Sequence, residues 1–265
     1  MKSLLKTLAR RLLPESRYRA LAARAQEARD LRAFQEWTTT DQRRLEFYRQ
    51  FASKDSLVFD VGANLGNRSK IFLKLGAKVV AFEPQDKCAD FLCEALHGTP
   101  NFQLVRKALG ASPGQAEMLV SNDHTISSLS STWVQTVKKT GRFAEDKPNW
   151  NERQVVPIAT LDQYISLHGC PAFIKIDVEG FEDQVLAGLT KPVPALSMEF
   201  TPECLESTWR CIDHLGRLGN FQFQLSLGES MEFALPDWTT SDGVRLVLAN
   251  VPQTDFGDLY ARLVH

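Results

Sequence analysis

The sequence predicts an α/β protein in which helices cover both faces of a mostly parallel sheet. From residue 56 onward, short apolar runs rich in Val, Ile and Phe alternate with stretches of helical periodicity. This alternation is typical of parallel strands joined by helices. The chain has 265 residues, of which 43% are hydrophobic, so it can bury one large core. A turn that contains glycines directly follows the first apolar run.

Residues 1–50 predict a helical extension, broken at Pro14, ahead of one domain over residues 51–265. The first 32 residues carry nine Lys and Arg against three acids, although the whole chain has a net charge of −1. Leucines gather on one helical face of this basic segment, at Leu4, Leu5, Leu8, Leu12 and Leu13. We expect the helix to dock on its own domain or on a partner, with peripheral membrane contact as the alternative.

The acidic remainder of the chain argues against a nucleic-acid partner, because such binding needs clustered cations. The five cysteines form no C-x-x-C pair, which favours a reducing compartment over a disulfide framework or a structural zinc site. No apolar stretch approaches the ~20 residues that a membrane span needs. We therefore expect a cytoplasmic protein, with membrane association through the basic helix as the alternative. The oligomeric state stays open.

Apolar runs in the first half of the domain predict strands that alternate with helices. The first two strands are each followed by a helix, and Gly76 and Gly98 are expected to end these helices. The strands are predicted at residues 56–61, 78–84 and 102–109, with an added edge strand at 116–121.

Residues 122–156 show no clear period and are predicted to form a lid or substrate loop. Thr160 and Gln163 then have the spacing of a capping box that opens a short helix. A longer helix is expected to begin with Thr201 as its N-cap and to end at Gly219. Further strands bring the core sheet to seven and are predicted at residues 172–180, 195–200, 221–227 and 244–250, the last two with no helix between them.

The stretch "FDVGANLG", residues 59–66, indicates which cofactor binds at the turn. Gly62 and Gly66 let the backbone pass close to a ligand, and the next helix points unpaired N–H groups at it. Asp60 would repel a pyrophosphate, but its carboxylate suits an ammonium group. Glu83 ends the second strand 21 residues after Gly62, where an acid commonly holds a ribose diol. This combination indicates S-adenosylmethionine rather than NAD.

The turn also departs from the dinucleotide pattern, because it reads G-x-N-x-G instead of G-x-G-x-x-G. Its Asn64 offers polar contacts to an amino-acid moiety. An NAD-dependent oxidoreductase is the first alternative, although Tyr164 has no Lys four residues further on to complete a catalytic pair. A non-catalytic cofactor-binding or scaffold module is the second. S-adenosylmethionine affinity would separate the three.

Four stretches, "VFDVGANLG", "AFEP", "VPIATLDQY" and "IKIDVEGFE", together resemble the FkbM-type S-adenosylmethionine-dependent methyltransferases over about residues 55–250. The resemblance implies the Rossmann-like class I methyltransferase fold, with sheet order 3-2-1-4-5-7-6 and an antiparallel last strand. It also implies O-methylation of a hydroxyl on a sugar, glycan, lipid-linked or secondary-metabolite acceptor. Matched position by position, it implies a cofactor site made of Asp60, Gly62, Asn64, Gly66, Glu83, Pro84, Ala108, Leu109 and Asp177.

Three acids are predicted at the reactive end of the cofactor. Asp177 and Glu179 follow one core strand and Glu199 lies on the next, so all three should meet at one sheet edge. They are candidates for a general base or hydroxyl anchor, because like-charged neighbours raise a carboxyl pKa towards neutrality. A divalent metal is the alternative that we do not favour, since the spacing resembles no dedicated metal cage. His124 in the predicted lid is a further candidate base, because histidine titrates near neutral pH.

Two charged residues near these acids, Lys175 and Glu182, are expected to have structural roles. Lys175 is unusual inside an apolar strand and is expected to pair with an acid. Glu182 is expected on a solvated helix face. A nucleic-acid amino-methylase usually carries an Asn/Asp-Pro-Pro-aromatic motif after the fourth strand, where this chain has "DVEG". The acids in that stretch would repel phosphates, which also disfavours a nucleic-acid acceptor.

Overall fold

The computed structural model describes residues 15–264. Contacts between residues divide the chain after Thr38 into two compact units. In the first unit, α2 (Glu15–Gln35) is one continuous helix. The second unit begins with α3 (Thr39–Tyr48), so this helix belongs to the unit that holds the sheet, whereas the sequence placed it in the extension.

The leucine face predicted near the N-terminus lies outside the described residues. Peripheral membrane contact through it stays a prediction. Within residues 15–264, no helix combines the length and the apolar character that crossing a membrane requires.

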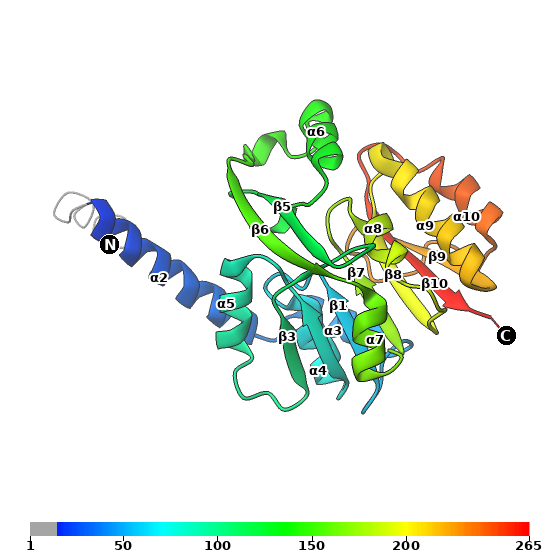
Figure 1. The fold of residues 1–265 in the computed structure, drawn as a ribbon, viewed down its shortest axis with the longest axis horizontal. Coiled ribbons are helices and arrows are strands. Elements are labelled where there is room, and N and C mark those ends of the chain that lie inside the picture. The colour runs from blue at the N-terminus through cyan, green and yellow to red at the C-terminus, as the bar shows by residue number, and fades with distance from the viewer. Residues whose placement is uncertain (1–14, 265) are drawn as a thin grey trace. The chain divides into compact units, whose positions relative to one another are not determined.

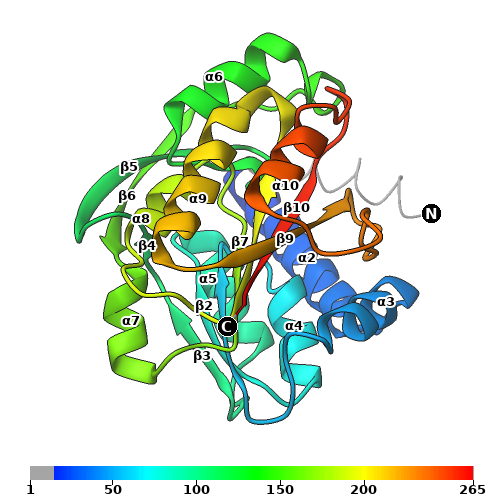
Figure 2. The same ribbon diagram turned by 90° about the vertical axis from the view of Figure 1, so that its right-hand side faces the viewer.

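The second unit is built on a seven-stranded sheet with the order β3-β2-β1-β7-β8-β10-β9 (Figures 1 and 2). Counted within this sheet alone, the order is 3-2-1-4-5-7-6, which confirms the predicted fold. β10 runs antiparallel to both of its neighbours, and the other neighbouring pairs are parallel. The strands are β1 (Leu57–Val61), β2 (Lys78–Phe82), β3 (Phe102–Val105), β7 (Phe173–Ile176), β8 (Ala195–Phe200), β9 (Phe221–Leu227) and β10 (Gly257–Leu263).

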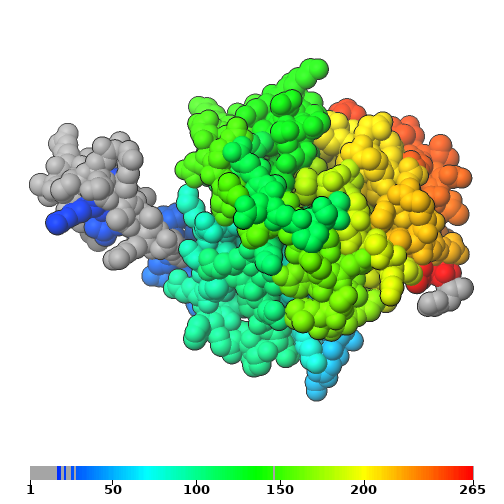
Figure 3. Space-filling view, in the orientation of Figure 1, coloured from blue at the N-terminus to red at the C-terminus, as the bar shows by residue number. Residues whose placement is uncertain are grey.

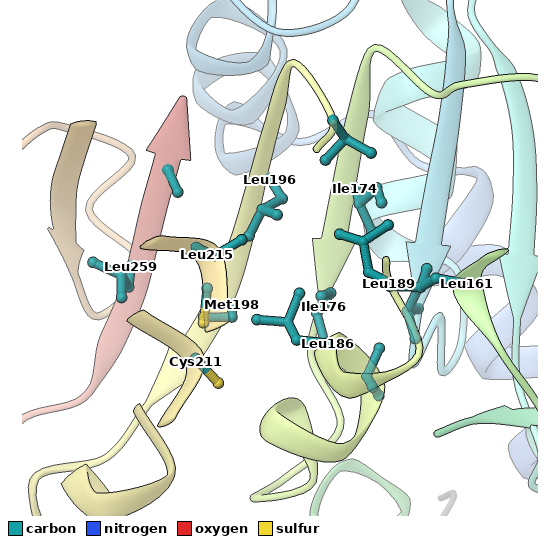
Figure 4. Close-up of a cluster of buried hydrophobic side chains, with 14 of the residues drawn as sticks. Leu161, Ile174, Ile176, Leu186, Leu189, Leu196, Met198, Cys211, Leu215 and Leu259 are labelled. Carbon is teal, nitrogen blue, oxygen red and sulfur yellow. The ribbon is translucent and has the colours of Figure 1, made fainter. Parts of the chain in front are cut away.

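Successive side chains of each strand point to opposite faces of the sheet. Both faces therefore carry apolar side chains, and helices cover both. Val58 of β1 packs in the cluster that contains α3, α4 (Asn67–Lys74) and α5 (Asp86–Ala95). Its neighbour Phe59 packs in the opposite cluster. Figure 4 shows part of that second cluster, in which side chains of β7 and β8 lie against the helices. The helices on this face are α7 (Leu161–His168), α8 (Glu182–Ala187), α9 (Leu205–Leu218) and α10 (Ser241–Leu248).

A second, three-stranded sheet corrects two predicted strands. The chain leaves the main sheet after Val105, where the exposed Arg106 and Lys107 interrupt the apolar run. The predicted strand over 102–109 is therefore two strands, and the one predicted over 116–121 does not extend the main sheet. The second sheet has the order β4-β6-β5 and consists of β4 (Ala108–Leu109), β5 (Gly114–Val120) and β6 (Glu152–Ala159).

The lid segment (residues 122–156) is more regular than the sequence predicted. It contains α6 (Ser131–Thr140), which Ser130 caps by accepting a hydrogen bond from the backbone of Trp133. Its buried side chains, among them Trp133 and Trp150, form a small apolar cluster that also includes Leu119 of β5. The space-filling view shows green atoms of this region beside the yellow atoms around α9 (Figure 3). The segment also contains short 3-10 turns at His124–Ile126 and Ala144–Asp146, and its last residues, 152–156, are the start of strand β6 and not part of a loop.

The predicted strand at 244–250 is wrong, because those residues belong to α10 and the last strand is β10. Val244 and Leu248 are four residues apart and both buried, which is the spacing of one helix face. Thr240 caps α10 by accepting a hydrogen bond from the backbone N–H of Gly243.

Of the three signals predicted for α7 and α9, two are confirmed and one is not. Thr160 and Gln163 form the predicted capping box at α7. Gly219 ends α9 as predicted. Thr201 does not cap α9, because a 3-10 turn at Pro202–Cys204 comes first and the Thr201 side chain makes no capping hydrogen bond.

Candidate active site

A cavity of about 260 Å³ opens at the carboxyl ends of β1, β2, β7 and β8. Ligands of open α/β sheets bind at this edge, where the direction of the connections reverses. Every residue that the sequence predicted for cofactor binding or catalysis lines the cavity except Gly66. Gly66 instead precedes α4 with φ of +82°, a left-handed conformation that glycine adopts without steric strain.

Glycine is needed at position 62 by the packing of the protein itself, apart from any ligand. Its φ is +81°, and a Cβ atom at this position would lie 1.8 Å from the carbonyl oxygen of Asp177. The first turn of the cofactor motif therefore packs directly against the end of β7. A side chain at Gly62 would separate the two strand ends that carry the predicted site.

Asn64 ties the turn to its surroundings. Its backbone N–H donates to Glu83 Oε2 at 2.7 Å, and its Nδ2 donates to the carbonyl oxygen of His124 at 3.0 Å. Gln85 Nε2 donates to the same carbonyl at 3.1 Å. His124 is exposed on the cavity rim and joins the turn through its backbone.

Glu83 is buried at the end of β2, with both carboxylate oxygens facing backbone donors. Oε1 accepts from the N–H of Gln85 at 2.7 Å, and Oε2 accepts from Asn64. Burial raises the pKa of Glu83 to about 7 against the opposing effect of these two bonds. Each oxygen keeps a lone pair that can accept a ligand hydroxyl.

Asp60 is buried at the end of β1 and accepts a hydrogen bond from Ser69 Oγ at 2.6 Å. Burial raises its pKa, whereas the Ser69 bond and the cations Lys175 and Arg68 act in the opposite direction. A ligand ammonium beside Asp60 would favour the ionised carboxylate further.

Apolar side chains line the opposite end of the cavity. Ala108 and Leu109 of β4 are buried there, beside Met118 of β5. Pro84 also lines the cavity, and its carbonyl oxygen accepts a hydrogen bond from Gln154 Nε2 at 2.7 Å. The two sheets thus meet at an apolar wall suited to a planar heterocycle.

The structure brings Asp177, Glu179 and Glu199 together, with one carboxylate oxygen of each within 4.8 Å of those of the other two. Burial, followed by the mutual repulsion of these acids, raises the pKa values of Glu179 and Glu199 well above the ordinary range. Both groups therefore favour the protonated form more than an ordinary glutamate does, and an approaching cation would favour the ionised form.

The lid segment holds Glu179 in an unusual conformation. Glu179 has a positive φ of 55°, and its carbonyl oxygen accepts a hydrogen bond from Ser128 Oγ at 2.6 Å. A Cβ atom on Gly180 would lie 2.4 Å from the ring of Trp133. The loop after β7 is therefore packed from above by α6.

Lys175 pairs with acids as predicted. Its side chain is 1% exposed, and Nζ donates to Asp177 Oδ2 at 3.1 Å and to Asp258 Oδ1 at 2.9 Å. Burial acts to lower the pKa of Lys175, but these carboxylates outweigh it and the pKa rises. Sequence reasoning did not identify Asp258, because strand β10 was not predicted.

Glu182 is buried and not on a solvated helix face, which corrects the sequence prediction. Its Oε1 accepts from the backbone N–H groups of Val178 and Gly180, both at 3.2 Å. These two hydrogen bonds let Glu182 fix the conformation of the loop that carries Glu179. Burial raises its pKa to about 7 despite these bonds.

We expect the unliganded protein to lose stability as the pH rises from 5 to 8.5. Glu83 and Glu182 have folded pKa values near 7, above the ordinary value of 4.5, so the folded state binds more protons than the unfolded state between these values. This stabilisation is complete below pH 4.5 and disappears above 7, at about 3 kcal/mol for each group. Urea denaturation at several pH values measures it. Glu182→Gln should flatten the curve, and a stability that rises with pH would contradict the assignment.

Sequence reasoning missed a group of charges on the cavity wall. Arg44 comes from α3, Arg68 from the first turn of α4, and Glu229 from the loop after β9. Arg68 Nη2 donates to both oxygens of Glu229, at 2.7 and 2.8 Å, and Arg44 Nη2 donates to Oε2 at 3.0 Å. No local motif marks these residues, because three separate elements bring them together.

The sheet order and the cavity at its carboxyl edge are those of the Rossmann-like class I methyltransferase fold. Within this class, the model of the "Methyltransferase FkbM domain" family matches residues 60–209, more than half of the chain. The chain belongs to this family. It is an enzyme that uses S-adenosylmethionine as its methyl donor, and the oxidoreductase and scaffold alternatives are excluded.

Solved structures of similar fold are distant in sequence. A putative O-methyltransferase from Klebsiella pneumoniae is 8% identical, with TM-score 0.45, and the match covers 91% of this chain and 89% of that one. A putative methyltransferase from Streptococcus mutans in complex with SAH is 12% identical, with TM-score 0.41 and coverage of 86% and 100%. An rRNA methylase from Streptococcus thermophilus is 14% identical, with TM-score 0.40 and coverage of 83% and 94%. Such likenesses say nothing about the acceptor. No curated protein matches the chain in sequence.

Proposed function

We propose that this enzyme transfers the methyl group of S-adenosylmethionine to a hydroxyl of a small molecule, such as a sugar, a glycan, a lipid-linked compound or a secondary metabolite. The observation that carries the proposal is the cluster of Asp177, Glu179 and Glu199 at the carboxyl edge of the sheet. A neutral hydroxyl must lose its proton when it attacks the methyl group, and these carboxylates offer a base.

The cofactor is proposed to lie along the sheet edge. Asp60 binds the ammonium group and Glu83 binds the ribose diol, while Gly62 and Asn64 form the turn beside the methionyl chain. Pro84, Ala108 and Leu109 form the wall against the adenine ring. This placement directs the methyl group towards the acids at the ends of β7 and β8, and Gly66 supports it by starting α4.

The acceptor oxygen attacks the methyl carbon in line with the departing sulfur. The new bond forms between oxygen and carbon, the carbon–sulfur bond breaks, and its electron pair neutralises the sulfonium. The hydroxyl proton passes to a carboxylate. We assign this base role to Glu179 and Glu199, since the cofactor's positive charge favours their ionised forms. Asp177, anchored by Lys175, orients the acceptor. His124 is a second candidate base at the rim.

A divalent metal bound to the three acids is the competing mechanism. Carboxylate oxygens within 4.8 Å of one another are ligands that Mg²⁺ accepts. Bound there, a metal would acidify the acceptor hydroxyl directly. Our proposal needs no metal, so turnover should persist after dialysis against EDTA. Activity that disappears and returns with Mg²⁺ or Mn²⁺ would assign the acids as ligands instead.

The nature of the methylated atom tests the proposal. Purified enzyme is incubated with S-adenosylmethionine labelled with ¹³C in its methyl group and with fractionated small-molecule extract or RNA. We expect label in the small-molecule fraction, with the ¹³C chemical shift of a methoxy group. The acids at the reactive end disfavour phosphates, so RNA should stay unlabelled. Label on nitrogen or carbon, or in RNA, would overturn the proposal.

A further inference from the structure

Two arginines on the cavity wall meet at the carboxylate of Glu229, and Arg44 Nη1 also lies 3.9 Å from Asp41 Oδ1. Arg44 and Arg68 both donate to Glu229, and their side chains are only 15% and 11% exposed. Within residues 15–264, neither Nε atom has a hydrogen-bond partner, although both are buried. Glu229 is half exposed, and the two guanidinium groups hold its pKa below the usual value against the effect of burial. Both arginines line the cavity, and each keeps a buried Nε–H group that no described group accepts.

The other two cations that line the cavity, Lys107 and Lys175, are less suited to binding an anion near β1. Lys175 is already shared between Asp177 and Asp258. Lys107 precedes β4, at the end of the cavity where the adenine ring is proposed to lie. The arginine pair is therefore the best placed of the described cations to receive a ligand anion near β1.

Asp60 and Arg68 line the same cavity, and Asp60 accepts a hydrogen bond from Ser69, the residue that follows Arg68 in α4. An α-amino acid carries its ammonium and its carboxylate on the same carbon atom. If Asp60 receives the ammonium of the methionyl group, the carboxylate must lie within a few ångströms of it. A carboxylate needs N–H donors there, and guanidinium groups supply them in a fork that matches its two oxygens.

We propose that Arg68 and Arg44 bind the carboxylate of the methionyl group of S-adenosylmethionine, opposite Asp60, which binds the ammonium. This inference rests on the cofactor site proposed above and adds two residues to it from outside the sequence motifs. Through its hydrogen bonds, Glu229 holds the two guanidinium groups at the cavity wall before the cofactor binds. The side of the cavity beside Glu199 is then left for the acceptor.

Ligand binding to the Arg68→Gln variant tests the proposal. Calorimetry compares S-adenosylmethionine, its decarboxylated form and methylthioadenosine, which share the adenosine but differ in carboxylate and ammonium. Charge-assisted hydrogen bonds of this kind change affinity by about 10- to 100-fold. We expect Arg68→Gln to weaken S-adenosylmethionine by about that factor and to leave the other two ligands nearly unchanged. Arg68→Lys should restore part of the loss, and Arg44→Gln should repeat it to a smaller degree.

Glu83→Gln is the matched control, because all three ligands carry the ribose and should weaken together. Equal weakening of the three ligands by Arg68→Gln, or an unchanged affinity for S-adenosylmethionine, would overturn the arginine assignment. Wild-type protein that binds none of the three would instead overturn the proposed cofactor site. Thermal unfolding of each variant separates a lost contact from a lost fold.

Discussion

Replacing Gly62 with alanine should abolish S-adenosylmethionine binding and lower the free energy of unfolding by more than about 3 kcal/mol. The left-handed backbone at φ +81° is one source of strain, and the overlap of the new Cβ with the Asp177 carbonyl oxygen at 1.8 Å is the larger one. Relief of that overlap must move the turn away from the end of β7. Urea denaturation measures the loss of stability, and calorimetry measures the loss of binding.

Gly98→Ala is a matched control for this variant. Gly98 also has a positive φ, of +72°, but nothing lies within 4 Å of a Cβ atom placed there. It should lose only the conformational part, about 1–2 kcal/mol, and keep its affinity for the cofactor. Equal losses in the two variants would show that the contact between Gly62 and the end of β7 has no energetic weight.

Replacing Asp177 with asparagine should lower kcat by about 10²- to 10⁴-fold while S-adenosylmethionine still binds. Asp177 joins Lys175 to the acid cluster, and the amide removes the charge that orients this cluster towards the acceptor. Glu199→Gln should reduce kcat over the same range, because it removes one of the two proposed bases. Methyl transfer in single-turnover assays measures the effect, once labelling has identified the acceptor.

Glu206→Gln provides the comparison for both acids, since Glu206 is exposed on α9 away from the cavity. Its kcat should equal that of the wild type. Full activity in Asp177→Asn would remove this residue from the site. A loss of cofactor affinity that accounts for the whole loss of turnover would assign Asp177 to binding and not to the chemical step.

The site residues that could be predicted are those next to strand ends with a local signature. Asp60 and Glu83 follow apolar runs that read plainly as parallel strands, and parallel strands bring their carboxyl ends to one edge. The same logic placed Glu199 beside Asp177, and the structure finds their oxygens within 4.8 Å. Residues of this kind need no knowledge of the rest of the chain.

The predicted secondary structure was wrong where an apolar run fits both the helical period and the alternation of a strand. The run "VRLVLAN" fits a strand, but Thr240 and the pair Val244 and Leu248 make it a helix against α9. The true last strand was therefore missed, and with it Asp258. The lid segment was predicted as a loop because its elements are short and its buried side chains, such as Trp133 and Trp150, come together only in the folded protein.

The sequence alone determined the class of sheet, the cofactor and the three acids that meet at one sheet edge, because each depends on residues close together in the chain. Tertiary structure alone decided which distant groups meet them. It placed Asp258 under Lys175, Trp133 on Gly180, and Arg44 and Arg68 on the wall beside Asp60. Such contacts depend on how helices pack across a sheet, and helical periodicity tells which side chains face inward but not which partners they find there.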